Sequence, residues 1–242
     1  MYAIEALALT KKYKDVTAVD GLDLKIQEGE IFSLLGVNGA GKTTAIRMLS
    51  CLSAPSSGRA LVGGYDLLDE SDKIKRIIAI SPQATAIAPN LTVKENLELI
   101  CGIHGFSRER TRERIDELSS SFSLGTVIER KAGKLSGGWQ RRLSIAMALI
   151  SEPSILFLDE PTLGLDVIAR SELWDVIRTL NGKATVILTT HYMEEAEALS
   201  DRIGIMKDGK LLTVGTSKEI MEMTGKEKFE EAFVEVVRGT SL

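Results

Sequence analysis

The sequence predicts an α/β protein in which most strands of the core run parallel. Two features of its 242 residues lead to this fold class. Short apolar segments with strand character alternate with longer segments in which apolar residues have helical spacing. The connections between them are short, which favours parallel strands joined by right-handed helical crossovers. A chain of this length can bury one large apolar core, so we expect a single domain over residues 1–242.

The first third of the chain begins with β-structure and then forms a helix. Gly29 marks a turn between two early strands, and helical spacing runs from residue 42 to residue 52. The segments with strand character in this region are residues 3–9, 22–26, 30–35, 60–62 and 77–80. We therefore expect a β-rich N-terminal part.

Residues from about 85 to 135 are expected to form a helical insert. Thr92 and Glu95 have the spacing of a capping box, and apolar residues follow them at helical intervals. A second, charged helix is predicted over 107–118. After the insert the mixed pattern resumes, with a helix over 167–180 between strands at 155–158 and 184–188.

Charge and hydropathy exclude several classes of protein. The 30 Lys and Arg against 34 Asp and Glu give a net charge of −4, which argues against a nucleic-acid partner. Its 44% hydrophobic and 26% charged residues are typical of a globular chain. No apolar run approaches the roughly 18 residues that cross a bilayer, and residues 1–12 lack the pattern of a secretory signal. We expect a cytosolic chain.

A glycine-rich segment follows the strand at 31–35 and opens the next helix. It matches the pattern G-x-x-x-x-G-K-[ST], in which glycines let successive backbone amides point at phosphate oxygens. Lys42 supplies a charge for the terminal phosphates, the Thr43 hydroxyl suits Mg²⁺, and Thr44 adds a donor. The predicted nucleotide-binding residues are Gly36, Val37, Asn38, Gly39, Ala40, Gly41, Lys42, Thr43 and Thr44. A glycine-rich turn without a ligand is the alternative.

Two consecutive carboxylates, Asp159 and Glu160, end the apolar strand at 155–158. In an open α/β fold, residues at the carboxyl ends of parallel strands face the ligand crevice. Asp159 is therefore expected to hold Mg²⁺, directly or through its water. Glu160 is expected to polarise the water that attacks the γ-phosphorus.

A second anion-binding turn is predicted further along the chain. Leu135-Ser136-Gly137-Gly138 precedes a helix with apolar spacing. The Ser136 side chain and the amides of Gly137 and Gly138 would offer donors at the start of this helix. One chain therefore contains two predicted phosphate sites.

Six motifs, in this order, resemble those of the ATP-binding subunits of ATP-binding cassette (ABC) transporters. They are Gly36–Thr43, Ser81–Gln83, Leu135–Gly138, Asp159–Thr162, Leu163–Asp166 and Thr190–His191, and they extend over most of the chain. The resemblance implies a P-loop NTPase core of mainly parallel sheet, with an N-terminal antiparallel β-subdomain and the helical insert. Residues 1–242 would then be one nucleotide-binding domain with a helical tail over about 216–242.

The resemblance also assigns roles to single residues. Gln83 matches the glutamine that contacts Mg²⁺ and water, and His191 matches the histidine that contacts the γ-phosphate. Asp166 matches the aspartate that links two sites across a dimer, and Tyr13 lies where the family has an aromatic that stacks on adenine. The implied catalytic residues are Lys42, Gln83, Glu160 and His191, and the implied metal ligands are Thr43, Gln83 and Asp159. A half-buried structural tyrosine is the alternative for Tyr13.

In this family the Ser-Gly-Gly turn of one subunit closes over the ATP bound by another, which implies a head-to-tail homodimer with ATP and Mg²⁺. The motifs look most like ABC-2 type exporters of drugs, lipids or polysaccharides. Separate transmembrane permease subunits would hold such a chain at the inner face of the cell membrane. A soluble ATPase that serves a scaffold, such as iron–sulfur cluster assembly, is the alternative. Trp139 departs from the glutamine that usually follows the turn.

Residues 229–237 have apolar side chains at the spacing of an amphipathic helix, with acidic residues mostly on its other side. We expect this helix to fold back on the core rather than to dock on a partner. The acidic side makes an anionic membrane surface an unsuitable target.

Overall fold

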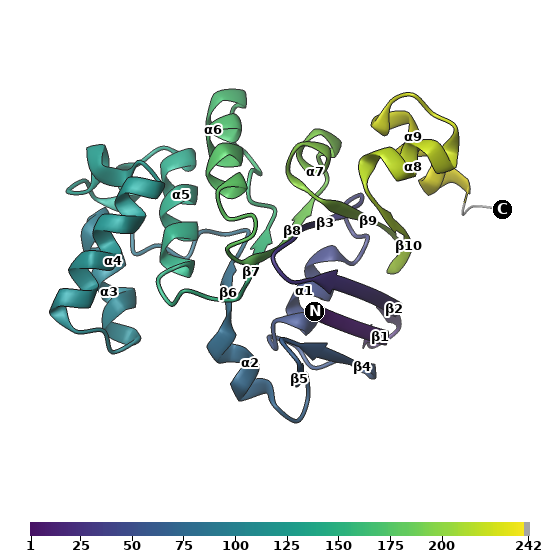
Figure 1. Ribbon diagram of the computed structural model, residues 1–242, viewed down its shortest axis with the longest axis horizontal. Coiled ribbons are helices and arrows are strands. Elements are labelled where there is room, and N and C mark those ends of the chain that lie inside the picture. The colour runs from purple at the N-terminus through teal and green to yellow at the C-terminus, as the bar shows by residue number, and fades with distance from the viewer. Residues whose placement is uncertain (240–242) are drawn as a thin grey trace.

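The computed structural model describes residues 1–239, and residues 240–242, the end of the expected tail, lie outside the described residues. The strands form two sheets (Figure 1). The central sheet has six strands in the order β10-β9-β3-β8-β7-β6. Their bounds are β3 Ile31–Leu35, β6 Ile78–Ser81, β7 Ile155–Asp159, β8 Thr185–Thr190, β9 Arg202–Lys207 and β10 Lys210–Gly215. All neighbours pair in parallel except β10, which is antiparallel to β9, so the predicted mainly parallel sheet is confirmed.

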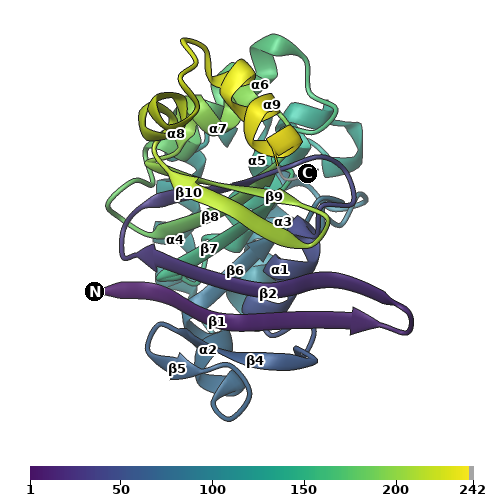
Figure 2. The same ribbon diagram turned by 90° about the vertical axis from the view of Figure 1, so that its right-hand side faces the viewer.

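The second sheet is antiparallel and comes mainly from the N-terminal part of the chain. Its order is β2-β1-β4-β5, with bounds β1 Tyr2–Tyr13, β2 Val16–Gln27, β4 Ser57–Val62 and β5 Tyr65–Asp66. Helix α1, Lys42–Leu49, lies between the two sheets (Figure 2), and its apolar side chains pack against both. The β-rich N-terminal part expected from the sequence is therefore confirmed as an antiparallel sheet.

The central strands are apolar along their whole length because helices or strands cover both faces of the sheet. Every residue of β3, β7 and β8 is buried. Along β7, Leu156 and Leu158 belong to one apolar cluster, whereas Ile155 and Phe157 belong to the cluster that contains α1. Since side chains alternate along a strand, this one sheet builds two cores.

The helical region lies at the end of the molecule opposite the C-terminal helices (Figure 1). It contains α3 Val93–Ile103, α4 Arg108–Ser121 and α5 Gly137–Ala148, with short 3₁₀ turns at Leu124–Val127 and Ala132–Lys134. The predicted capping box is confirmed, because Glu95 N donates to Thr92 Oγ1 at 3.1 Å and Thr92 N donates to Glu95 Oε2 at 2.7 Å. The apolar sides of these helices join the cluster that covers one face of β7 and β8.

The remaining helices are α2 Ser71–Ile77, α6 Val167–Arg178, α7 Met193–Leu199, α8 Ser217–Thr224 and α9 Phe229–Gly239. Helix α6 corresponds to the one expected over 167–180. Helices α2 and α7 and the β9–β10 hairpin were not predicted from the sequence. The turn of this hairpin, Asp208-Gly209, lies between two apolar runs. Asp-Gly in that position is a strong hairpin signal and would have identified the β9–β10 hairpin.

The amphipathic helix α9 folds back on the chain, as expected. Phe229, Ala232 and Phe233 are buried in a cluster with Ile203 and Ile205 of β9. Figure 2 shows α8 and α9 beside the β9–β10 hairpin. Among residues 1–239, no helix combines the length and the apolar character needed to cross a membrane.

Truncation of the Phe229 side chain tests this packing. Phe229 is 3% exposed, so Phe229→Ala removes a buried ring and is expected to lower the free energy of unfolding by about 3–5 kcal/mol. Urea denaturation followed by circular dichroism measures the change. The exposed neighbour Glu230 provides the control, because Glu230→Ala should change stability by less than about 0.5 kcal/mol. Equal effects of the two changes would contradict docking of α9 on the core.

Candidate functional site

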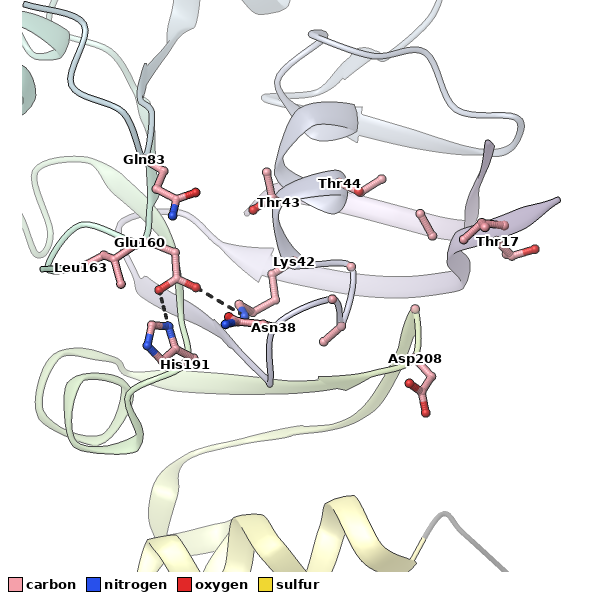
Figure 3. A pocket seen from close by; sticks show the side chains of 16 residues that line it. Thr17, Asn38, Lys42, Thr43, Thr44, Gln83, Glu160, Leu163, His191 and Asp208 are labelled. Carbon is pink, nitrogen blue, oxygen red and sulfur yellow. Dashed lines mark hydrogen bonds and ion pairs between the residues drawn. The ribbon is translucent and has the colours of Figure 1, made fainter. Parts of the chain in front are cut away.

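A cavity of about 700 Å³ opens where the carboxyl ends of the central strands meet the start of α1 (Figure 3). The loop between β3 and α1, the tip of the β1–β2 hairpin and the β9–β10 turn form its walls. Its lining residues are Val16, Thr17, Ala18, Asn38, Gly39, Ala40, Gly41, Lys42, Thr43, Thr44, Gln83, Glu160, Leu163, His191, Asp208 and Gly209. Seven of the nine residues predicted for the phosphate loop therefore line one cavity, and the exceptions are Gly36 and Val37.

The loop between β3 and α1 requires glycine for two different reasons. A Cβ atom at Gly36 would lie 2.3 Å from the Met206 carbonyl oxygen, and one at Gly41 would lie 2.4 Å from that of Ala18. Gly39 has open space beside it but adopts a φ of +83°, which other residues rarely adopt. The β9 strand and the β1–β2 hairpin thus contact the loop backbone directly. A side chain on the loop at Gly36 or Gly41 would prevent this close approach.

The Lys42 side chain is buried and directed into the loop. Its Nζ donates to the Gly36 carbonyl oxygen at 2.7 Å and to that of Val37 at 3.2 Å. It also lies 3.4 Å from Glu160 Oε1. The ammonium group therefore bridges the glycine loop and the end of β7 (Figure 3).

Asp159 is the last residue of β7 and is 7% exposed. Its Oδ1 accepts hydrogen bonds from Thr43 Oγ1 at 3.0 Å and from Thr189 Oγ1 at 2.6 Å. A buried carboxylate beside a threonine hydroxyl is a set of hard oxygen donors, the kind that Mg²⁺ prefers. The residues predicted to hold the metal therefore fit it chemically.

Glu160 lies between a lysine and a histidine. Besides its contact with Lys42, its carboxylate has Oε2 2.7 Å from His191 Nδ1. Glu160 adopts a φ of +48°, a strained value for a residue with a side chain. Its backbone N–H donates to Thr189 Oγ1 at 2.9 Å, which supports this conformation. The carboxylate is thus held at the cavity wall with a defined direction.

Gln83 follows β6, the neighbour of β7 in the central sheet, and also lines the cavity. Its side chain points toward the space between Glu160 and Thr43 (Figure 3). The four predicted catalytic residues, Lys42, Gln83, Glu160 and His191, therefore surround one space, although they come from four separate segments.

Tyr13 does not line this cavity. It lies at the end of β1 with 44% of its surface exposed, and Lys11 Nζ lies 5.0 Å from the centre of its ring. The neighbouring residues Val16, Thr17 and Ala18 line the cavity instead. These three residues were not predicted, because a hairpin tip of this kind has no motif of its own.

The turn of Ser136, Gly137 and Gly138 also lies outside the cavity. Ser136 precedes α5 in extended geometry, and its side chain makes no capping hydrogen bond with the helix. Gly138 faces α6, since a Cβ atom there would lie 3.0 Å from Ala169 Cβ. Asp166 caps α6, with Oδ1 accepting from Ala169 N at 2.9 Å. This structural role of Asp166 was not predicted, although an Asp before a helix is a common cap.

Glu195 is a buried acid that the sequence analysis did not single out. It lies on α7 with no exposed surface, and its Oε1 accepts from Trp174 Nε1 at 3.1 Å. Burial raises the pKa of the Glu195 carboxyl, and the hydrogen bond from Trp174 offsets this rise only in part. Ionising Glu195 therefore takes a higher pH in the folded protein than in the unfolded chain.

A family model described as ABC transporter matches residues 19–163. The chain is 43% identical over 224 residues to the daunorubicin/doxorubicin resistance ATP-binding protein DrrA of Streptomyces peucetius, covering 92% of this chain and 68% of that protein. A solved ATP binding subunit of an ABC transporter superposes with a TM-score of 0.85 at 28% identity, covering 97% of this chain and 99% of that one.

A second solved structure shows a dimer. It is a post-hydrolysis state of the ATP-binding cassette MJ0796 bound to ADP and phosphate. Its TM-score is 0.78 at 30% identity, and the match covers 88% of this chain and 98% of that one.

The raised pKa of Glu195 makes stability depend on pH. An unfolded glutamate ionises near pH 4.5, whereas the folded one stays protonated to a higher pH. The Glu195 carboxyl therefore makes its full contribution to the free energy of unfolding below pH 4.5 and loses it as pH rises through the folded pKa. The loss is at most about 1.4 kcal/mol per pH unit. Glu195→Gln removes the ionisation. The free energy of unfolding of Glu195→Gln, relative to that of the unmodified chain, should rise as pH rises. Urea titrations of both chains between pH 5 and 9 measure this difference. A difference that stays constant over this range would refute the prediction.

Proposed function

The chain belongs to the ABC transporter family, and we propose that it is the ATP-hydrolysing subunit of an exporter whose membrane-spanning segments lie on separate permease chains. As a member of this family it binds and hydrolyses ATP. One observation carries the proposal: a phosphate loop, the Glu160 carboxylate, a glutamine and a histidine line a single cavity, and Asp159 hydrogen-bonds to Thr43 in its wall. Each of these groups has a task in phosphoryl transfer to water.

The glycine loop would bind the triphosphate. Its amides and the N-terminal end of α1 offer donors and a positive potential to phosphate oxygens. Lys42 Nζ, which contacts loop carbonyls and Glu160, would turn to the terminal phosphates when ATP binds. The adenine would lie at the far end of the cavity beside Val16 and Ala18, with the exposed Tyr13 ring turning onto its face.

Glu160 and His191 would act on the attacking water. The Glu160 carboxylate accepts a proton from the water while the water oxygen bonds to the γ-phosphorus and the bond to the ADP oxygen breaks. The 2.7 Å contact with His191 Nδ1 fixes the direction of that carboxylate, and the imidazole would also contact the γ-phosphate. Gln83, which also lines the cavity, would orient the water.

Thr43, Asp159 and Gln83 would hold Mg²⁺. When bound, the ion neutralises charge on the phosphate oxygens. The carboxylate and two side-chain oxygens match its preference for hard donors.

Two copies of the chain would close head to tail around two ATP molecules. The Ser136–Gly138 turn lies outside the cavity of its own chain, so it is free to cover the nucleotide of another copy. Asp166 would link the two sites. The apolar side chains beside it, Leu163, Val167 and Ile168, are 38%, 72% and 71% exposed, as suits a protein interface. The dimer of the similar MJ0796 cassette supports this arrangement.

The export role rests on the relatives. DrrA is named for resistance to daunorubicin and doxorubicin, so we infer an ABC-2 type exporter and a position at the inner face of the cell membrane beside its permease. The alternative role in iron–sulfur cluster assembly draws no support from the comparisons.

Removal of the Lys42 ammonium tests the phosphate loop. Lys42→Ala deletes charge-assisted hydrogen bonds to the phosphates, each contributing about 1.5–3 kcal/mol, so ATP affinity is expected to fall about 10- to 100-fold. Binding of a fluorescent ATP analogue measures it. Lys228→Ala, at an exposed lysine near the start of α9, serves as the control and should bind normally. Unchanged affinity in Lys42→Ala would rule out this loop as the phosphate site.

Replacement of Glu160 tests the proposed base and the dimer together. Glu160→Gln is expected to bind ATP and to hydrolyse it at least about 100-fold more slowly than the unmodified chain. It should therefore accumulate as an ATP-bound dimer, which size-exclusion chromatography detects. The exposed Glu197→Gln is the control and should turn over normally. Adding Ser136→Arg to Glu160→Gln should abolish the dimer, because the long side chain blocks the covering turn. A dimer that persists in the double variant would exclude the proposed head-to-tail contact.

A further inference from the structure

Arg141 is a buried arginine that bonds to backbone carbonyl groups around the site. It lies on α5 and is 4% exposed. Its Nη1 donates to the Pro82 carbonyl oxygen at 2.6 Å, and its Nη2 donates to that of Gln83 at 2.6 Å and to that of Glu160 at 3.4 Å. Within residues 1–239, no carboxylate lies within ion-pair distance of this guanidinium.

A buried guanidinium without a carboxylate partner is costly. Burial lowers the pKa of Arg141, and the Asp159 and Glu195 carboxylates oppose this only from a distance. The next residue on α5 shows the more common solution: Arg142 is also buried, but it pairs with Glu172 and lies over the Trp139 ring. The position of Arg141 is therefore unusual even within its own helix.

The hydrogen bonds of Arg141 define the backbone of two neighbouring segments that line the cavity. Its planar fork binds two consecutive carbonyl groups, which fixes the orientation of the peptide between Pro82 and Gln83. One turn further along α5, Ser144 Oγ lies 3.0 Å from Ser81 Oγ, so the end of β6 is fastened to α5 at two points. The bond to the Glu160 carbonyl oxygen joins the end of β7 to the same guanidinium.

We propose that Arg141 is a positioning residue for ATP hydrolysis, which holds Gln83 and Glu160 at a fixed separation through their backbone carbonyl groups. The inference rests on the roles given above to Gln83 and Glu160. Arg141 itself does not line the cavity, so it acts through these two residues and not on the nucleotide. Helix α5 begins at the Ser136–Gly138 turn about 7.5 Å away, so this turn and both catalytic segments share one rigid element.

Replacement of Arg141 by methionine tests the proposal. Methionine fills a similar volume but donates no hydrogen bond, so Gln83 and Glu160 lose their common anchor. A displacement of about 1 Å at the site can cost on the order of 100-fold in rate, so kcat is expected to fall about 10- to 100-fold. The KM for ATP should stay within about threefold, because the phosphate loop is untouched. Arg141→Lys keeps the charge and one donor nitrogen and should recover part of the lost kcat.

Arg114 is the matched control. It also binds backbone carbonyl groups at α5, those of Leu149 and Ile150, but at the end of the helix away from the cavity. Arg114→Met should lower the melting temperature about as much as Arg141→Met and leave kcat within about twofold. A comparable loss of kcat in both variants would mean that only the stability of α5 matters, and would overturn the proposal.

A double-mutant cycle with Gln83→Ala provides the second measurement. If Arg141 acts through Gln83, Arg141→Met should cost at least about threefold less in kcat once Gln83 has been replaced. Equal fold-losses in the two backgrounds, or an unchanged kcat in Arg141→Met, would overturn the inference. Absence of ATP hydrolysis in the unmodified chain, in contrast, would refute the proposed function itself.

Discussion

Two consecutive carboxylates at the end of a fully buried strand impose the constraint on which the rest of the site depends. Asp159 and Glu160 are each 7% exposed, and a buried charge needs donors from its surroundings. Those donors come from three directions: Thr43 and Lys42 of α1, Thr189 of β8, and His191 just beyond it. The central sheet and α1 therefore have to meet at this point.

The glycine loop is constrained by steric contact and not by charge, because uncharged backbone groups of neighbouring strands lie very close to it. Strand β9 approaches Gly36 and the β1–β2 hairpin approaches Gly41, so both the central and the antiparallel sheet shape the loop. Helix α1 lies between these sheets and directs its N-terminus at the cavity. The antiparallel sheet thus serves the site twice, since its hairpin tip also forms the cavity wall at Val16 and Ala18.

The turn at Ser136 and the phosphate loop do not share a cavity within one chain, and α5 connects them indirectly. Ser136 directly precedes its first turn, and about one and a half turns later Arg141 binds the segments that present Gln83 and Glu160. Trp139, the departure from the family pattern, lies against Arg142 rather than in the cavity. The side chain of Trp139 thus packs between α5 and its surroundings. Ser136 and both glycines of the family pattern are still present.

The sequence alone determined the fold class, the phosphate loop, the capping box at Thr92 and the two carboxylates, because each has a signal within a few residues of chain. It also indicated that Gln83 and His191 belong to the site, through resemblance. Only the tertiary structure decided which residues meet: Thr43 bonds to Asp159 across 116 positions, and Arg141 to Pro82 across 59. It alone showed the burial of Glu195 and the place of Tyr13 outside the cavity. Such contacts depend on how sheets and helices pack, and no local pattern encodes that packing.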